Sequence, residues 1–75
     1  MKHIVEVIAK SLVDHPEQVV VNEKQEDRMI VYELHVATDD MGKVIGKQGR
    51  IAKAMRAVVK AAAARENKKV TVEII

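Results

Sequence analysis

Residues 41–65 read Met-Gly-Lys-Val-Ile-Gly-Lys-Gln-Gly-Arg-Ile-Ala-Lys-Ala-Met-Arg-Ala-Val-Val-Lys-Ala-Ala-Ala-Ala-Arg. This basic segment holds all three glycines of the chain, Gly42, Gly46 and Gly49, and seven of its thirteen basic residues, but no acidic residue. The remainder, with six basic and eleven acidic residues, carries a charge of −5, so the net charge of +2 conceals a polarised molecule. A segment this cationic is suited to binding an anion.

The glycines divide the basic segment into two predicted helices and a short loop. Residues 38–40, Thr-Asp-Asp, supply N-cap candidates for a helix over 41–45, and Gly46 lies where a left-handed turn would end that helix. A second helix is predicted to follow Gly49 and to run to about Ala64. Its predicted buried stripe consists of Ile51, Ala54, Met55, Val58, Ala61 and Ala62.

The chain on either side of the basic segment predicts one further helix and three strands. Apolar residues recur with helical spacing over 2–13, and Pro16 ends that helix because the residue before a proline is disfavoured in the helical conformation. Short β-branched or alternating runs predict strands near 18–24, 29–37 and 69–75, with polar residues between 23 and 28 forming a hairpin turn. The order α-β-β-α-α-β predicts one α+β domain over residues 1–75, a three-stranded sheet with helices packed on one face.

The composition excludes several classes of function. The chain has no cysteine, so it can form neither a disulfide nor a thiolate metal site, and no catalytic thiol is present. The longest apolar run is the four alanines at 61–64, far short of the ~20 residues that span a bilayer, and the start lacks the apolar run of a signal peptide, so we expect a cytoplasmic protein. Tyr32 is the only aromatic residue, which excludes a surface that stacks bases on aromatic rings.

The glycine-bounded loop over 46–49 combines two features of anion-binding sites. The helix that follows presents free backbone N–H groups and the positive end of its dipole, and glycines without a Cβ allow a sugar-phosphate backbone to approach. Lys47 projects from the loop, and Lys43 and Arg50 flank it. Along the second helix the spacing i, i+3, i+7 continues the positive charge in a stripe: Lys53, Arg56 and Lys60.

Residues 44–50, Val-Ile-Gly-Lys-Gln-Gly-Arg, resemble the apolar-Ile-Gly-x-x-Gly signature of the KH domain, whose loop clamps about four nucleotides of single-stranded RNA. The order of elements is similar to the type II arrangement of that domain, and the resemblance covers the whole chain. A chain with one such module resembles the bacterial KhpA family. This resemblance implies a cytoplasmic RNA chaperone that partners a larger KH protein, KhpB, and is linked to cell-shape and cell-wall control. With the basic stripe, it gives these predicted RNA-binding residues: Lys43, Val44, Ile45, Gly46, Lys47, Gln48, Gly49, Arg50, Lys53 and Arg56.

A KH groove is lined by aliphatic side chains, and the candidates here come from both helices and from the second strand: Val44, Ile45, Ile51, Leu34 and Val36. Because one module contacts only about four nucleotides, avidity favours a homodimer or a heterodimer with another KH protein. Val59, off the predicted buried stripe, is a candidate for that contact. The alternative is a protein-interaction or dimerisation module in which the two glycines only shape a turn.

The sequence contains no set of residues typical of a catalytic site. The three histidines, His3, His15 and His35, share no spacing, and Ser11 lacks the glycines of a nucleophile elbow. Asp39 and Asp40 are better explained as helix caps than as a metal pair. We therefore expect no cofactor, no metal, no small-molecule substrate and no membrane partner.

Overall fold

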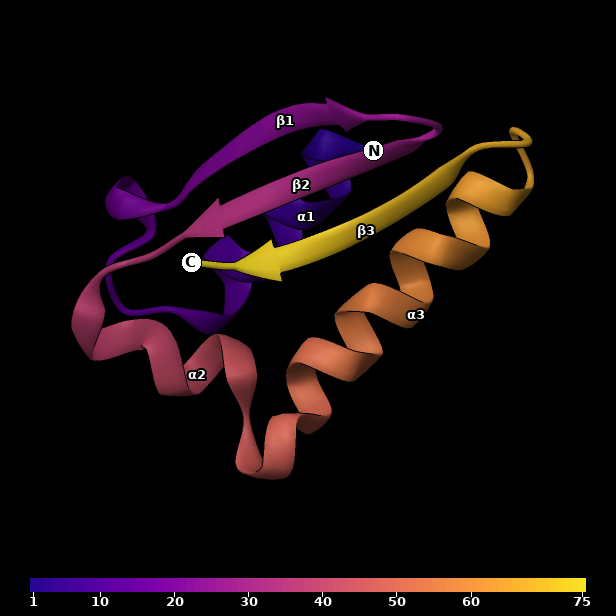
Figure 1. Cartoon of the computed structure of the whole chain (residues 1–75). Coiled ribbons are helices and arrows are strands. Elements are labelled where there is room, and N and C mark those ends of the chain that lie inside the picture. Colours follow the sequence, from indigo (N-terminus) through magenta and orange to yellow (C-terminus); the bar gives the residue numbers. More distant parts are fainter.

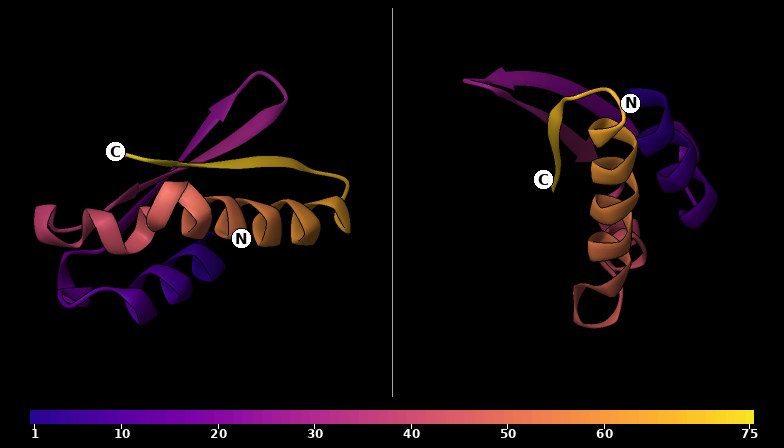
Figure 2. Two further views of the ribbon diagram at one scale, coloured as in Figure 1. Left: turned by 90° about the horizontal axis from the view of Figure 1, so that it is seen from below. Right: turned by 90° about the vertical axis from the view of Figure 1, so that its right-hand side faces the viewer.

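The computed structural model describes all residues, 1–75, and has the predicted α+β architecture of a three-stranded sheet with helices against it (Figure 1). The main elements are α1 (Lys2–Leu12), β1 (Val20–Glu26), β2 (Met29–His35), α2 (Met41–Ile45), α3 (Arg50–Ala64) and β3 (Lys69–Ile74). Single 3-10 turns precede β1, α2 and α3, at Pro16–Gln18, Thr38–Asp40 and Lys47–Gly49. The helices lie on one side of the sheet, as Figure 2 shows.

The sheet has the order β1-β2-β3, so β2 is central and β3 is an edge strand. β1 and β2 pair antiparallel, from Val20 opposite His35 to Glu26 opposite Met29. β2 and β3 pair parallel, beginning with Met29 opposite Lys69. Two parallel strands need a long crossover connection, and here α2, the glycine-bounded loop and α3 provide it. The fold thus places the loop at the turning point of that crossover, away from the sheet (Figure 1).

The core forms where α1 and α3 pack on the sheet. Its largest fully buried side chains include Val5 from α1, Leu34 and Val72 from the sheet, Val44 from α2 and Val59 from α3. Burying a side chain of this size contributes about 1.5–3 kcal/mol, so these five positions hold the two long helices against the strands. None of the helices is both long enough and apolar enough to cross a membrane.

The β1–β2 hairpin differs from its prediction. β1 continues through polar residues to Glu26, and the turn consists of only two residues, Asp27 and Arg28. Asp27 has a φ of 47°, which aspartate tolerates better than most residues, so this tight turn needs no glycine. Only Val21 of β1 is buried, so the remaining positions of the strand are exposed and accommodate polar side chains. β2 ends at His35 rather than at residue 37.

The predicted buried stripe of α3 is only partly confirmed: Met55 is buried, Ile51 and Ala62 are half-buried, and Ala54, Val58 and Ala61 are exposed. The residues that are buried are Ala52, Met55, Val59 and Ala63. Val58 is 51% exposed, whereas Val59, which we expected at the surface, is 0% exposed. Both series have helical spacing, and Ala and Val occupy most of the circumference of this helix, so the apolar pattern alone does not select one.

Candidate nucleic-acid interface

The loop over 46–49, called here the GxxG loop, owes its shape to backbone conformations that glycine favours. Gly46 has φ 75° and ψ 173°, a region occupied almost only by glycine, and its N–H donates to the carbonyl of Gly42 (2.8 Å). Gln48 and Gly49 are both left-handed, with φ 58° and 73°. The N–H of Gly49 donates back to the carbonyl of Gly46 (3.1 Å). Three of the four residues have positive φ, so the loop is a tight, hydrogen-bonded turn.

A side chain at Gly46 would collide with the first turn of α3. An added Cβ would lie 2.6 Å from Cγ1 of Ile51, whereas at Gly49 it would meet nothing within 4 Å. The two glycines therefore serve different purposes: Gly46 allows α2 and α3 to approach each other, and Gly49 permits a left-handed residue at the entrance of α3.

The GxxG loop presents positive charge and an open helix end to solvent. Lys47, Gln48 and Arg50 are all exposed, and the guanidinium of Arg50 reaches the side-chain oxygen of Gln48 (3.5 Å). No side chain caps the N-terminus of α3, so the positive end of its dipole remains exposed beside the loop. Lys53 is exposed one turn further along α3. These features converge on one surface that suits a phosphate backbone.

Lys43, predicted as a contact for RNA, instead forms ion pairs within the protein. Its ammonium contacts the carboxylate of Asp14 and lies 3.5 Å from Oδ1 of Asp40. The hydrogen bond to Asp14 is the largest influence on Lys43 and raises its pKa, with a smaller contribution from Asp40. Lys43 is therefore occupied in holding α2 against the segment that follows α1.

Asp40 departs most from its predicted role, which was to cap the helix over 41–45. Its side chain does not cap α2. It is 0% exposed, and its two carboxylate oxygens accept the backbone N–H groups of Asp14 (3.1 Å) and His15 (3.0 Å). Burial alone would raise the pKa of Asp40, but these two hydrogen bonds and Lys43 outweigh it and leave the pKa below its usual value. Asp40 thus fixes the start of α2, and no local signal distinguishes it from its exposed neighbour Asp39.

The aliphatic candidates divide into core and surface. Val44 and Leu34 are 0% exposed, so in this structure both side chains belong to the core. Ile45 is 36% exposed, and Ile51 and Val36 are half-buried. Ile45 precedes the GxxG loop directly and Ile51 lies beside Gly46, so these two side chains supply apolar surface next to the loop.

Arg56 lies between the basic stripe and the sheet. Its Nε donates to the carbonyl of Val72 on the edge strand β3 (2.9 Å), and its side chain is half-buried. Arg56 therefore satisfies an edge carbonyl and ties α3 to β3, while Lys53 and Lys60 remain exposed on the same helix. Of the seven basic residues in the basic segment, only Lys43 has a carboxylate within 4 Å.

Proteins of one family are similar to this chain along its whole length. Residues 2–74 match the sequence profile of the family described as KhpA/KhpB, KH domain. The chain is 69% identical to the RNA-binding protein KhpA of Clostridium perfringens and 64% identical to that of Clostridium acetobutylicum, with both chains covered in full. A crystal structure of an Aquifex aeolicus Era variant superposes with a TM-score of 0.56 at 23% identity, over 97% of this chain and 28% of the Era chain. At this level of identity, the similarity supports the fold and carries no information about function.

Proposed function

Because the chain belongs to the KhpA/KhpB family of KH-domain proteins, we propose that it binds single-stranded RNA, whose backbone is clamped by the GxxG loop. The observation that carries this proposal is the loop itself. It is a tight turn with exposed Lys47 and Gln48, it leads into the uncapped N-terminus of α3, and its cations have no carboxylate partner. Backbone amides and cations in this arrangement suit phosphate groups.

The proposed mode of binding assigns separate tasks to charged and apolar residues. Lys47 and Arg50 neutralise phosphates at the GxxG loop, and Lys53 contacts the RNA backbone further along α3. Ile45, Ile51 and the half-buried Val36 contact the faces of the bases, since no aromatic side chain is available for stacking. Because phosphate contacts carry no sequence information, we expect weak sequence preference.

Family membership extends the proposal to partners and setting. A module that holds about four nucleotides binds weakly by itself, so the protein acts as a homodimer or with a KhpB-like KH protein. In this proposal it is a cytoplasmic RNA chaperone that is linked to cell shape and the cell wall. The family's curated relatives are named for RNA binding rather than for catalysis, in agreement with the absence of any catalytic constellation from the sequence.

The alternative is a protein-interaction module in which the GxxG loop only shapes the chain. One observation favours it: Ile51 leaves no room for a Cβ at residue 46, which gives Gly46 a structural role whether or not RNA is bound. Both readings require an intact turn, but only RNA binding requires the charge on the loop. A substitution that changes the charge and preserves the turn separates them.

The test is the double variant Lys47→Asp, Gln48→Asp. Both side chains are exposed, and aspartate tolerates the left-handed conformation of residue 48, so the melting temperature should change by less than about 5 °C. The variant removes one cation and adds two anions in the proposed phosphate path, and affinity for a short unstructured RNA should fall at least about tenfold. The dependence of affinity on salt should also become shallower.

A matched control separates this local effect from that of net charge. Lys2→Asp, His3→Asp also lowers the charge by three and lies at the exposed start of α1, where aspartate suits the helix dipole. The N-terminus lies far from the GxxG loop in Figure 1. We expect the control to bind RNA within about threefold of the parent, because exposed charges beyond a Debye length are screened. A loop variant that folds and binds RNA as well as this control does would refute the clamp.

A further inference from the structure

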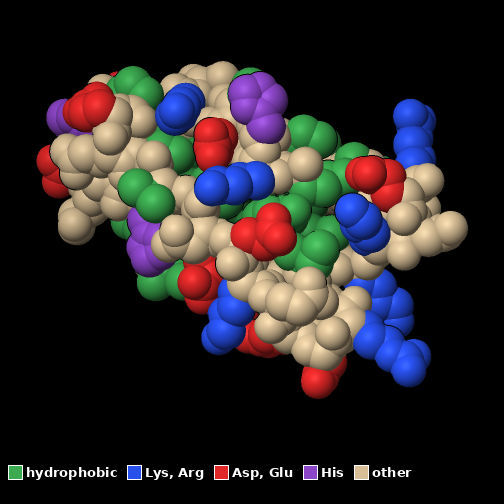
Figure 3. Space-filling view, turned by 90° about the horizontal axis from the view of Figure 1, so that it is seen from above, with side chains coloured by type: hydrophobic (Ala, Val, Ile, Leu, Met, Phe, Trp, Pro, Cys, Tyr) green, Lys and Arg blue, Asp and Glu red, His purple; other side chains and the backbone are tan.

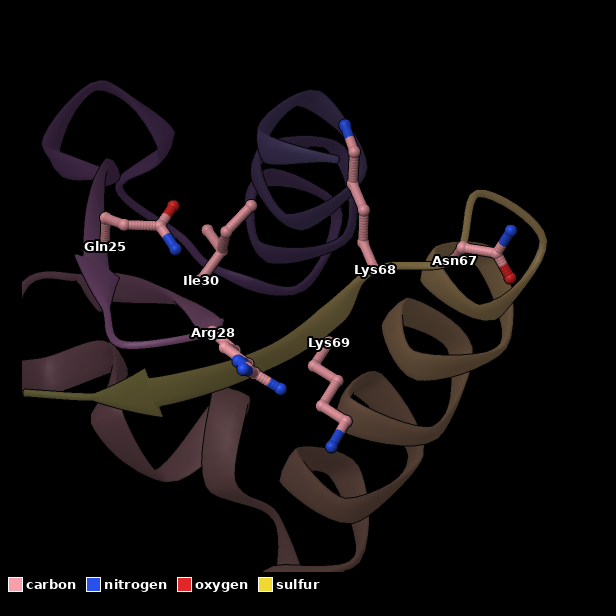
Figure 4. Close-up of a pocket in the computed structure, with 6 residues that line it drawn as sticks. All are labelled: Gln25, Arg28, Ile30, Asn67, Lys68 and Lys69. Atoms are coloured by element: carbon pink, nitrogen blue, oxygen red, sulfur yellow. The ribbon is translucent and has the colours of Figure 1, made fainter.

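A second group of cations lies at the opposite end of α3 from the GxxG loop. Here the β1–β2 turn and the α3–β3 connection meet beside an open hollow of about 350 Å³ (Figure 4). The hollow is lined by Gln25, Arg28, Ile30, Asn67, Lys68 and Lys69. An adjoining hollow of about 270 Å³ lies against α3 and is lined by Met29, Lys60, Lys68, Lys69 and Val70. We call Arg28, Lys60, Lys68 and Lys69 the distal basic cluster.

The four residues come from three segments: strand pairing brings Arg28 close to the start of β3, and the second hollow places Lys60 of α3 beside Lys68 and Lys69. Met29 lies opposite Lys69 in the parallel β2–β3 ladder, which places Arg28 of the hairpin turn next to the start of β3. The chain reaches β3 through a turn after α3 in which Asn67 is left-handed, with φ 56°. In Figure 4, Lys68 and Lys69 extend in opposite directions from neighbouring positions, so they present charge on both sides of the strand.

No residue of the distal basic cluster forms an ion pair within the protein. All four side chains are exposed, and none has a carboxylate within 4 Å. Of the acids near the hairpin turn, Glu26 pairs with Lys24 (3.2 Å). Glu26 and Asp27 also line a third hollow together with Arg28 and Lys69, but neither carboxylate lies within 4 Å of those two cations. The two hollows that Lys68 and Lys69 line together have no carboxylate in their walls. Figure 3 shows several Lys and Arg side chains at the end of the molecule where this hairpin lies, with acidic side chains among them.

The position of the distal basic cluster relative to the GxxG loop indicates which ligand the cluster could bind. α3 has 15 residues and so spans about 22 Å between the two. Exposed Lys53 lies along this path before Lys60 of the cluster, and Arg56 bridges α3 to β3 between them. A strand of RNA that leaves the loop along α3 therefore meets cations at intervals until it reaches Lys69 and Arg28.

We infer that the distal basic cluster is a second phosphate-binding surface, which holds the continuation of an RNA strand beyond the roughly four nucleotides at the GxxG loop. This inference rests on the proposed function. It predicts that affinity rises with RNA length and that the added affinity comes from electrostatic contacts at the far end of α3.

The test compares two lengths of RNA on one variant, Arg28→Gln, Lys69→Gln. The probes are an unstructured tetranucleotide and an unstructured dodecanucleotide, titrated at several salt concentrations and followed by amide chemical shifts. We expect the variant to bind the dodecanucleotide at least about tenfold more weakly and the tetranucleotide within about twofold of the parent. Its salt slope on the longer RNA should decrease by about 1.4, since each phosphate contact on a single strand contributes about 0.7.

The control Lys10→Glu lowers the charge by the same two units at an exposed position of α1 and should bind both probes as the parent does. If the distal variant binds the longer RNA as well as this control does, the inference is wrong. It is also wrong if both RNA lengths lose affinity equally. If the distal variant binds RNA normally but the loop variant Lys47→Asp, Gln48→Asp no longer binds the tetranucleotide, only this inference is refuted. If the loop variant still binds the tetranucleotide as the parent does, the proposed function itself is refuted.

Discussion

The two ends of α2 are built in opposite ways. At its start, Asp40 is fully buried and holds the N–H groups of Asp14 and His15, with Lys43 closing the group. At its end, Gly46 leads into a loop whose charged side chains reach solvent. The anchored end fixes the helix to the segment after α1, and the open end leaves polar groups available to a ligand.

Lys43 and Lys47 make the difference concrete. They lie four residues apart in the basic segment, and the sequence alone presents them as equivalent candidates. Lys43 is paired with an acid 29 positions away, whereas Lys47 has no carboxylate within 4 Å. The comparison shows that the charge count of a segment sets an upper limit on its binding groups, and tertiary contacts decide which remain free.

The largest expected effect comes from breaking the open end with Gly46→Val. The new Cβ would lie 2.6 Å from Ile51, in a conformation almost restricted to glycine. Strained backbone and overpacking cost about 1–3 kcal/mol each, against roughly 4–11 kcal/mol for a domain of this size. We therefore expect the melting temperature, followed by circular dichroism, to fall by about 15 °C or more.

Gly49→Asn is the matched control for that change. Asparagine tolerates the left-handed conformation, and nothing lies within 4 Å of the added Cβ. It should cost no more than about 1 kcal/mol. Equal losses at both glycines would show that Ile51 does not set the requirement at position 46.

The anchored end is broken by Asp40→Asn. Both carboxylate oxygens accept a backbone N–H, and an amide would turn an NH₂ group toward one of those donors. The melting temperature should fall by about 5–10 °C at pH 7, because a buried donor then lacks a partner. Asp39→Asn, an equal change of charge at the exposed neighbour, should leave it within about 2 °C.

The effect of Asp40→Asn should depend on pH. The pKa of Asp40 is lowered by folding, so its contribution is present above the unfolded pKa of about 3.9 and is lost as pH falls through the folded pKa. The gap in melting temperature between parent and variant should therefore be largest near neutral pH and should shrink below about pH 4. A gap that stays constant from pH 7 to pH 3 would contradict the ionised state assigned to Asp40.

Sequence reasoning predicted the features that depend on neighbours along the chain. The order of elements and the α+β class are confirmed, because periodicity and turn residues are local. The buried side of α3 was wrong because Val58 and Val59 are equally apolar, and only docking on the sheet distinguishes them. The anchoring by Asp40 and the meeting of Arg28 with Lys69 involve residues 25 to 41 positions apart, and no local pattern encodes them.

The smallest expected effect sharpens the comparison within α2 itself, through Gly42→Ala. Gly42 is the one glycine of the basic segment with an ordinary helical conformation, and an added Cβ would meet nothing within 4 Å. Alanine lowers the entropy of the unfolded chain and favours the helix, so the domain should gain about 0.5 kcal/mol, seen as a rise of about 2–4 °C in melting temperature. RNA affinity should not change, because neither the anchor at Asp40 nor the loop after Gly46 is altered. A loss of stability would mean that α2 needs flexibility at this position, and the division into an anchored end and an open end would then be wrong.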